Sequence, residues 1–296
     1  MIAEIKDISK VISNKEILKN ISFEIGKGEV IALVGPNGAG KTTLLNTLTY
    51  LSSFNKGTIL FEGMDKQKSP EIIFKNVSYM QDASILYKEL NGMDHLRFTA
   101  KINGKSKKDI ESVIKKLDIG EYVNKSVSKY SLGMKQHLLL SLSLLTSPKL
   151  LIMDEPLNGL DPTNSVKLRN LILDLKKEGT SILLSSHILS EVDKVADRVL
   201  FMNKGEIIST TEIKKDDAPM ANRYIIKVDD NKKVLKALNN YKLKLINSNS
   251  FEIEISELNF NNVIECLLNN KVKILDINKT KIGTELIYNN LYGEVL

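Results

Sequence analysis

A glycine-rich segment near the start of the chain has the residue types and spacing of a phosphate-binding loop. Residues 35–42 match the pattern G-x-x-x-x-G-K-[ST], in which backbone N–H groups point inward at phosphate oxygens. In such a loop Lys41 would reach the β- and γ-phosphates, and the Thr42 hydroxyl would ligate Mg²⁺. The residues expected to bind the nucleotide are Gly35, Pro36, Asn37, Gly38, Ala39, Gly40, Lys41, Thr42 and Thr43. The alternative interpretation is a glycine turn that binds nothing.

Two adjacent acids supply the second half of the predicted site. Asp154 and Glu155 follow the apolar run Leu150–Met153. An acid at the end of a buried strand can hold Mg²⁺, usually through its water, so we assign Asp154 to the metal together with Thr42. Glu155 would face the γ-phosphate and position or deprotonate the attacking water. Adjacent acids are also common at exposed strand ends, so this interpretation depends on the glycine-rich loop.

The elements that must position these residues are three continuous apolar runs, at 30–34, 150–153 and 182–184. Runs of this kind are typical of parallel strands that are buried on both faces. Polar or glycine residues follow each run, and open α/β sheets bind their ligands at the carboxyl ends of strands. A helix is expected over 41–50, directly after the loop. The sequence therefore predicts an α/β nucleotide-binding domain of the P-loop NTPase class with a mostly parallel sheet.

Between about residues 82 and 147 the pattern becomes mostly helical. Residues 105–117 place apolar side chains at helical spacing with lysines on the other face, which we interpret as a solvated face. The most apolar stretch begins at His137 and is about half as long as a membrane span requires, so it reads as a buried helix. We predict a helical subdomain here.

Further polar residues occur in register with the two nucleotide motifs. Gln81 follows a strand-like segment, Ser131 and Gly133 lie just before the apolar helix, Asp161 follows the acids, and His187 ends the third strand. Each has an ordinary alternative role: Ser131 as a helix N-cap, Gln81 as a polar loop residue, and His187 as a strand-end histidine whose hydrogen bonds are satisfied.

Together these motifs strongly resemble the ATP-binding cassette (ABC) ATPases over roughly residues 1–211. The resemblance rests on GPNGAGKTT, Gln81, SLGMKQ, LLIMDEP, NGLD and His187, all in the family's order and spacing. It implies that Gln81 senses Mg²⁺ and the attacking water, and that His187 hydrogen-bonds the γ-phosphate. It also implies that Ser131 and Gly133 contact ATP held by an opposite subunit, while Asp161 communicates across the dimer interface.

The chain departs from the family pattern at two places. The usual signature L-S-G-G-Q reads Tyr130-Ser131-Leu132-Gly133-Met134 here, which is similar to the branch of bacitracin-, lantibiotic- and other antibiotic-related exporters and immunity systems. In addition, Ile12 stands where the family usually has an aromatic residue that stacks on adenine. Isoleucine has no π-face, so we expect retained binding with weaker discrimination between bases.

A second domain is expected at 220–296, after a charged, proline-containing linker, with the cassette at 1–214. Its patterns alternate as β-α-β-β-α-β, which is the order of a small α+β ferredoxin-like fold. A last helix is expected over 284–291. We expect a regulatory or dimerising role, and a buried structural thiol at Cys266.

Composition limits the setting of these activities. The chain has 296 residues, a net charge of +6 and one cysteine, which fits a reducing compartment. We identify no signal peptide and no segment apolar enough to span a bilayer, so any membrane association is expected to be peripheral.

These observations predict an ATP-binding and ATP-hydrolysing subunit with ATP and Mg²⁺ as cofactors. It would lie in the cytoplasm, on the inner face of the cell membrane, where it powers export of a peptide antibiotic, drug or similar compound. Since the chain has one loop and one signature, its partners would be a second cassette subunit and an integral-membrane permease, with no nucleic acid. Two alternatives remain: a soluble cassette ATPase of the translation or DNA-repair type, and a regulatory module that binds ATP but hydrolyses it poorly.

Overall fold

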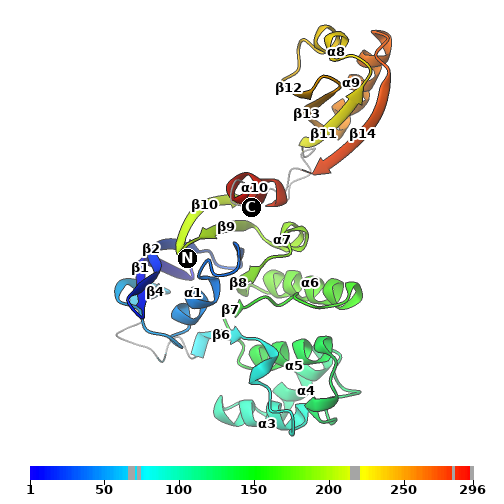
Figure 1. The fold of residues 1–296 in the computed structure, drawn as a ribbon. Coiled ribbons are helices and arrows are strands. Elements are labelled where there is room, and N and C mark those ends of the chain that lie inside the picture. Colours follow the sequence, from blue (N-terminus) through cyan, green and yellow to red (C-terminus); the bar gives the residue numbers. More distant parts are fainter. Residues whose placement is uncertain (66–70, 72–74, 214–220, 282–283, 294–296) are drawn as a thin grey trace. The chain divides into compact units, whose positions relative to one another are not determined.

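The computed structural model divides into two compact units, Met1–Ile213 and Lys214–Leu296 (Figure 1). The structure describes residues 1–65, 71, 75–213, 221–281 and 284–293. Each unit has its own hydrophobic core and is described separately below.

The first unit contains a six-stranded sheet in the order β10-β9-β3-β8-β7-β6. Its strands are β3 (Val30–Val34), β6 (Val77–Met80), β7 (Leu150–Met153), β8 (Ser181–Ser186), β9 (Arg198–Asn203) and β10 (Glu206–Glu212). All pairs are parallel except β10 with β9. Every residue of β3, β7 and β8 is buried, as their continuous apolar sequences require. The three predicted strands and the predicted sheet class are therefore confirmed.

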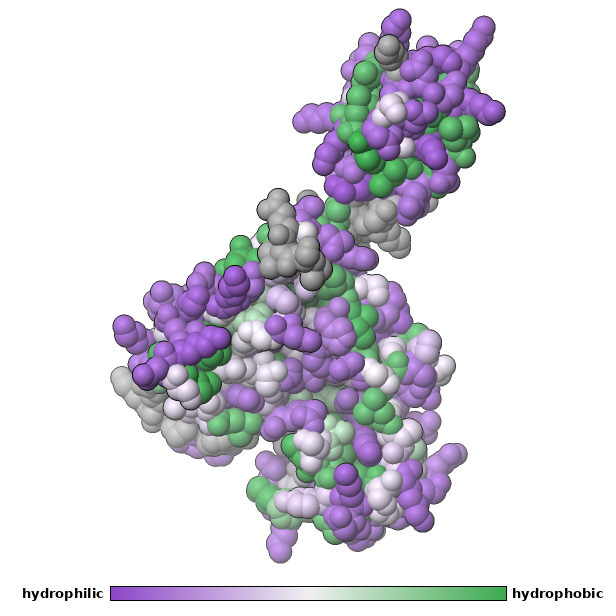
Figure 2. All heavy atoms as spheres, in the orientation of Figure 1, coloured by the Kyte–Doolittle hydropathy of each residue, from purple (hydrophilic) through white to green (hydrophobic). Residues whose placement is uncertain are grey.

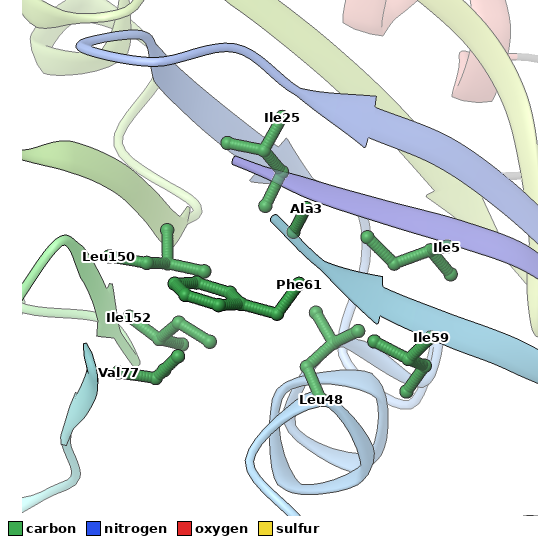
Figure 3. Close-up of a pocket in the computed structure, with 9 residues that line it drawn as sticks. All are labelled: Ala3, Ile5, Ile25, Leu48, Ile59, Phe61, Val77, Leu150 and Ile152. Atoms are coloured by element: carbon green, nitrogen blue, oxygen red, sulfur yellow. The ribbon is translucent and has the colours of Figure 1, made fainter. Parts of the chain in front are cut away.

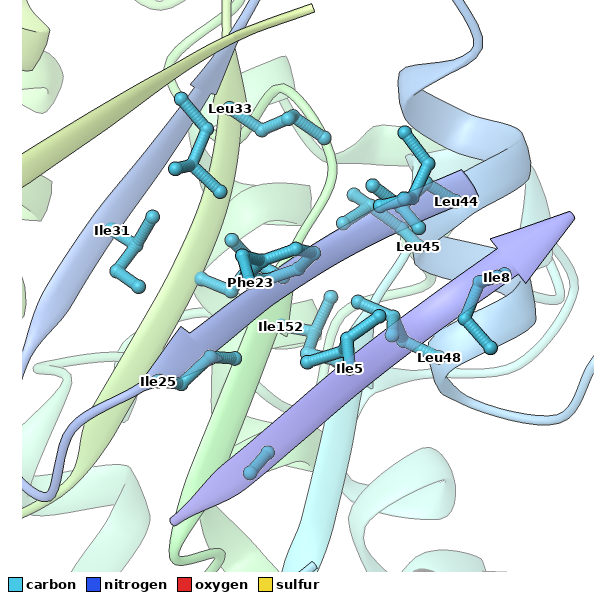
Figure 4. Packing of buried hydrophobic residues seen from close by; sticks show 14 of the residues in the cluster. Ile5, Ile8, Phe23, Ile25, Ile31, Leu33, Leu44, Leu45, Leu48 and Ile152 are labelled. Carbon is cyan, nitrogen blue, oxygen red and sulfur yellow. The ribbon is translucent and has the colours of Figure 1, made fainter. Parts of the chain in front are cut away.

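A second, antiparallel sheet was absent from the sequence prediction. It has the order β2-β1-β4-β5, with β1 (Ala3–Ile12), β2 (Lys15–Ile25), β4 (Lys56–Phe61) and β5 (Met64–Asp65). Its strands alternate polar and apolar residues, because only one face is buried. That face packs with α1 (Lys41–Leu48) and β3 to form the core shown in Figure 4.

The packing of this core is close. The void shown in Figure 3 has a volume of only about 10 Å³ and lies between the antiparallel sheet, α1 and the edge of the parallel sheet. Its lining is apolar, and a space of this size holds at most about one water molecule. The void between these elements is therefore too small to hold a ligand.

The helices after β6 pack on one another to form a subdomain. They are η1 (Ala83–Ile85), α3 (Gly92–Ile102), α4 (Lys107–Lys116), η2 (Val127–Lys129) and α5 (Leu132–Leu145). The predicted lysine-faced helix is confirmed as α4, whose Ile110 and Val113 are buried. The helices α6 (Pro162–Lys177) and α7 (Leu189–Val195) follow in the rest of the unit.

The second unit has the predicted β-α-β-β-α-β order. Its elements are β11 (Ala221–Val228), α8 (Asn231–Ala237), β12 (Leu243–Asn247), β13 (Ser250–Ser256), α9 (Glu257–Asn269), β14 (Ile274–Lys281) and the last helix α10 (Thr284–Tyr292). The sheet order β12-β13-β11-β14, with every pair antiparallel, is that of a ferredoxin-like fold. Cys266 was predicted to be buried, but the residue is only half-buried. Its Sγ donates to the carbonyl oxygen of Ala237 at 3.2 Å.

Hydrophilic residues predominate on the face of each unit seen in Figure 2. Among the described residues, no helix is both long enough and apolar enough to cross a bilayer.

Candidate nucleotide site

The glycine-rich loop connects the carboxyl end of β3 to the start of α1. Gly38 and Gly40 have φ angles of 78° and 106°, a region that favours glycine, and Gly40 caps α1. At Gly35 a Cβ atom would lie 2.1 Å from the carbonyl oxygen of Met202, so the close approach of β9 requires glycine. At Gly38 an added Cβ would meet nothing within 4 Å, which leaves the mouth of the loop open.

Lys41 begins α1, and its ammonium group folds back over the loop. The residue is 7% exposed. Nζ donates to the carbonyl oxygens of Gly35 at 2.8 Å and Pro36 at 3.3 Å. Thr42 is exposed and Thr43 half-buried in the same turn, while Asn37 is exposed and Ala39 buried in the loop. The Lys41 ammonium group and the exposed Thr42 therefore lie next to each other in sequence at the end of the loop.

The two acids follow β7, the second strand from β3. The N–H of Asp154 donates to the carbonyl of Met80 at 3.0 Å, which places the end of β7 beside Gln81, a half-buried residue. Glu155 has a φ of 49°, so the chain turns sharply after the strand. Its carboxylate lies 3.9 Å from Lys41 Nζ and 2.7 Å from His187 Nδ1. The structure thus brings together three predicted residues from three separate motifs.

Two hydroxyl groups that the sequence prediction missed hold Asp154. Ser185 on β8 donates to Asp154 Oδ1 at 2.5 Å, and the hydroxyl of Tyr79 on β6 donates to Oδ2 at 3.5 Å. Burial raises the pKa of Tyr79, and the charge of Asp154 adds to this, so the phenol remains a protonated donor. Both residues lie near the carboxyl ends of strands that flank β7, a position that could have indicated them.

Ser131, Gly133 and Asp161 lie at the starts of two other helices. Ser131 is the N-cap of α5 and accepts from the N–H of Met134 at 3.2 Å, and Asp161 is the N-cap of α6 and accepts from the N–H of Asn164 at 3.0 Å. That hydrogen bond holds the pKa of Asp161 below its usual range. A Cβ on Gly133 would lie 2.8 Å from Asn164 Nδ2, so the two helix starts touch. The ordinary capping role of Ser131 is therefore present in the structure.

The chemistry of these groups fits a nucleoside triphosphate with Mg²⁺. A hydroxyl and a carboxylate are the oxygen donors that Mg²⁺ accepts, and Thr42 and Asp154 would hold it. An ammonium group and a helix N-terminus suit the triphosphate. Among the described residues there is no cluster of three or more His, Cys, Asp or Glu side chains that could hold a metal ion.

Known proteins share this architecture. The family model described as "ABC transporter" matches residues 18–158. The uncharacterized ABC transporter ATP-binding protein YhcH of Bacillus subtilis is 32% identical over 99% of this chain and 96% of its own length. This chain belongs to the ABC transporter ATP-binding proteins. The lantibiotic transport ATP-binding protein SrtF of Streptococcus pyogenes is 40% identical over 71% of this chain and 90% of its own length.

Solved structures agree with this assignment. A structure described as that of the ATP-binding subunit of an ABC transporter superposes with a TM-score of 0.66 at 29% identity, covering 72% of this chain and 90% of that one. As a member of the ABC family, the protein is an ATP-binding ATPase. The alignment with YhcH also extends through the ferredoxin-like unit of this ABC protein.

Proposed function

We propose that this ABC ATPase powers the export of a peptide antibiotic or a similar compound, as a peripheral subunit on the inner face of the cell membrane. The observation that carries the proposal is the contact of Lys41, Glu155 and His187 at the mouth of the phosphate-binding loop. The antibiotic class is supported by the 40% identity to SrtF, a protein named for lantibiotic transport. It is also supported by the variant signature around Ser131.

Within the site, each residue has a distinct proposed role. The loop residues 35–43 would bind the triphosphate, and Thr42, Gln81 and Asp154 would hold Mg²⁺, which would supply positive charge to the phosphates. Glu155 takes the proton of the attacking water, and its distance of 2.7 Å to His187 Nδ1 supports this, since the imidazole orients the carboxylate. His187, half-exposed at the end of β8, also reaches the γ-phosphate once nucleotide is bound.

The remaining site residues serve a partner subunit. Ser131 and Gly133 lie at the N-terminus of α5, where backbone N–H groups favour a phosphate. We propose that they complete the ATP site of a second cassette. We also propose that Asp161, at the start of α6, couples the two ATP sites across the dimer interface.

The helical subdomain offers a surface for the permease. Between Gln81 and Asn103, five large apolar side chains are exposed: Ile85 (45%), Tyr87 (65%), Leu90 (41%), Phe98 (65%) and Ile102 (67%). Exposed apolar side chains in one segment favour a protein partner. Since Gln81 begins this segment beside Asp154, the same stretch of chain connects the nucleotide site to the proposed permease contact.

Copurification tests the transporter assignment. A tagged Glu155→Gln protein would be isolated from its host in detergent with ATP, and the bound chains identified. We expect a multi-span membrane protein, with less of it bound to a Lys41→Ala control. Recovery of ribosomal or DNA-associated chains, or of none, would instead favour a soluble cassette ATPase without a permease.

The antibiotic class has its own test. A host in which the wild-type gene is replaced by Glu155→Gln should become more sensitive to lantibiotic-class peptides. Sensitivity to unrelated antibiotics should be unchanged. Equal sensitivity of the two strains to every peptide tested would exclude this substrate class while leaving the transporter assignment intact.

A further inference from the structure

Ser185 stands between the two acids of the site. It is fully buried on β8, where its backbone pairs with Leu33 of β3. The hydroxyl donates to Asp154 Oδ1 at 2.5 Å, and it accepts from the backbone N–H of Glu155 at 2.8 Å. A buried hydroxyl is costly unless it is hydrogen-bonded, and both bonds of Ser185 go to consecutive residues of one motif.

The direction of these two bonds follows from the chemistry of the groups. An ionised carboxylate only accepts hydrogen bonds, and a backbone N–H only donates them. The single proton of Ser185 must therefore point at Asp154, and a lone pair must receive the N–H of Glu155. One hydroxyl thus connects the proposed metal ligand to the backbone of the proposed base.

The bond to Glu155 acts where the backbone is unusual. With a φ of 49°, Glu155 lies in the left-handed region that non-glycine residues rarely occupy. Conformations of this kind persist where surrounding contacts fix them. In this turn the side chain leaves the strand toward Lys41 and His187, at 3.9 Å and 2.7 Å. Loss of the Ser185 hydroxyl would leave the Glu155 N–H without this acceptor and release the turn.

We propose that Ser185 is a positioning residue for both acids. It orients Asp154 toward Mg²⁺ and holds the backbone turn that aims the Glu155 carboxylate at the attacking water. The proposal rests on the ATPase activity of the protein and on the proposed roles of the two acids, and it does not depend on the transported substrate.

An isosteric pair of variants separates the hydroxyl from the volume of the side chain. Ser185→Thr keeps the hydroxyl and adds a methyl group. Ser185→Val introduces a side chain of the same size as threonine but without the hydroxyl. The matched control is Ser181→Ala, at the other end of β8, because Ser181 is also buried and also accepts a backbone N–H, from Gly28 at 3.0 Å. All variants would be compared with wild type in the full-length protein.

Two readouts are needed. Removal of a group that orients a metal ligand typically costs about 10–100-fold in metal affinity or activity. We expect Ser185→Val to lower kcat by about this factor with a smaller change in KM for ATP. The gain in affinity for a fluorescent ATP analogue on adding Mg²⁺ should also shrink by about 10-fold. Ser185→Thr and Ser181→Ala should remain close to wild type in both measurements.

Several outcomes would overturn the proposal. The first is that Ser185→Val has the same kcat and the same Mg²⁺ response as Ser185→Thr. The second is that Ser181→Ala lowers kcat and the Mg²⁺ response as much as Ser185→Val does. Should Ser185→Val fail to fold, as its melting temperature would reveal, Ser185→Ala replaces it in the same two assays. Because the binding readout needs no turnover, it also separates a failure of this proposal from a failure of Glu155 as the base.

Discussion

At the scale of single residues, the proposed site centres on Glu155, whose carboxylate lies between a lysine and a histidine. Lys41 is almost fully buried against the loop carbonyls, while His187 is half-exposed, so the carboxylate faces protein on one side and solvent on the other. This is a suitable place for a group that must receive a proton from water while the phosphates bind next to it.

Changing Glu155 to Gln keeps the shape of the side chain and removes its basicity. We expect turnover to fall by about 10²–10⁴-fold, the usual worth of a positioned base. ATP affinity should be retained, because Lys41 and the loop amides are unchanged. Single-turnover ATP hydrolysis and equilibrium binding measure the two effects, and near-normal turnover would remove Glu155 from the mechanism.

We expect recognition of the nucleotide's adenine ring to depend on a different residue, at position 12. Ile12 is 45% exposed at the end of β1 and offers apolar contact without a π-face. Stacking on an aromatic residue is typically worth about 1–3 kcal/mol. We therefore expect Ile12→Tyr to tighten ATP binding by about fivefold or more, and Ile12→Leu to change it little.

Wild type should bind ATP and GTP about equally well. Titration calorimetry with both nucleotides checks this expectation together with the two variants. A strong preference of wild type for ATP, or no gain from the tyrosine, would contradict the role assigned to position 12.

At the scale of elements, helix starts do much of the positioning. Gly40 and Ser131 begin α1 and α5, and each brings backbone N–H groups to a place where phosphate is expected. The helix α5 is buried along most of its length, which explains its continuous apolar sequence. One titratable group on α5, His137, is affected by this burial.

Burial lowers the pKa of His137 from its ordinary value of 6.5, with Lys167 acting in the same direction and Asp118 opposing it. The folded protein then binds fewer protons than the unfolded chain just below about pH 6.5, so stability should fall as the solution is acidified through that range. When the pH is lowered from about 7.5 to about 5.5, we expect the melting temperature of His137→Gln to decrease less than that of wild type. Identical slopes for the two proteins would show that folding does not change the pKa of His137.

At the scale of the whole molecule, the chain carries one phosphate-binding loop and one signature. Within the subunit, Ser131 and Gly133 contact the first turns of α5 and α6, while Lys41, Glu155 and His187 meet elsewhere on the cassette. A second copy, or a second cassette chain, is therefore proposed to complete each site.

If ATP binds across the closed interface as proposed, it should favour the dimer most strongly when it cannot be hydrolysed. We expect Glu155→Gln to sediment as a monomer without nucleotide and as a dimer with ATP and Mg²⁺. The double variant that adds Lys41→Ala should remain monomeric. A monomer under every condition would favour a heterodimer with a different cassette chain.

The sequence alone determined the position of the predicted phosphate-binding loop and the elements that surround it. The spacing of Gly35, Gly40 and Lys41 is local, and a loop between a strand and a helix forms from contiguous residues. The buried strands could be predicted for the same reason, since a continuous apolar run is visible without its neighbours. The antiparallel sheet was missed because its strands bury one face, and their alternating pattern is a weaker signal.

Only the tertiary structure decided which side chains meet. The order of β6, β7 and β8 in the sheet places Tyr79 and Ser185 on either side of Asp154, although about 75 and 31 residues separate them in sequence. At the left-handed turn, the N–H of Glu155 likewise donates to the Ser185 hydroxyl on a neighbouring strand. Contacts of this kind depend on strand order and register, which are set by the packing of the whole domain. They cannot be predicted from the local spacing of residues.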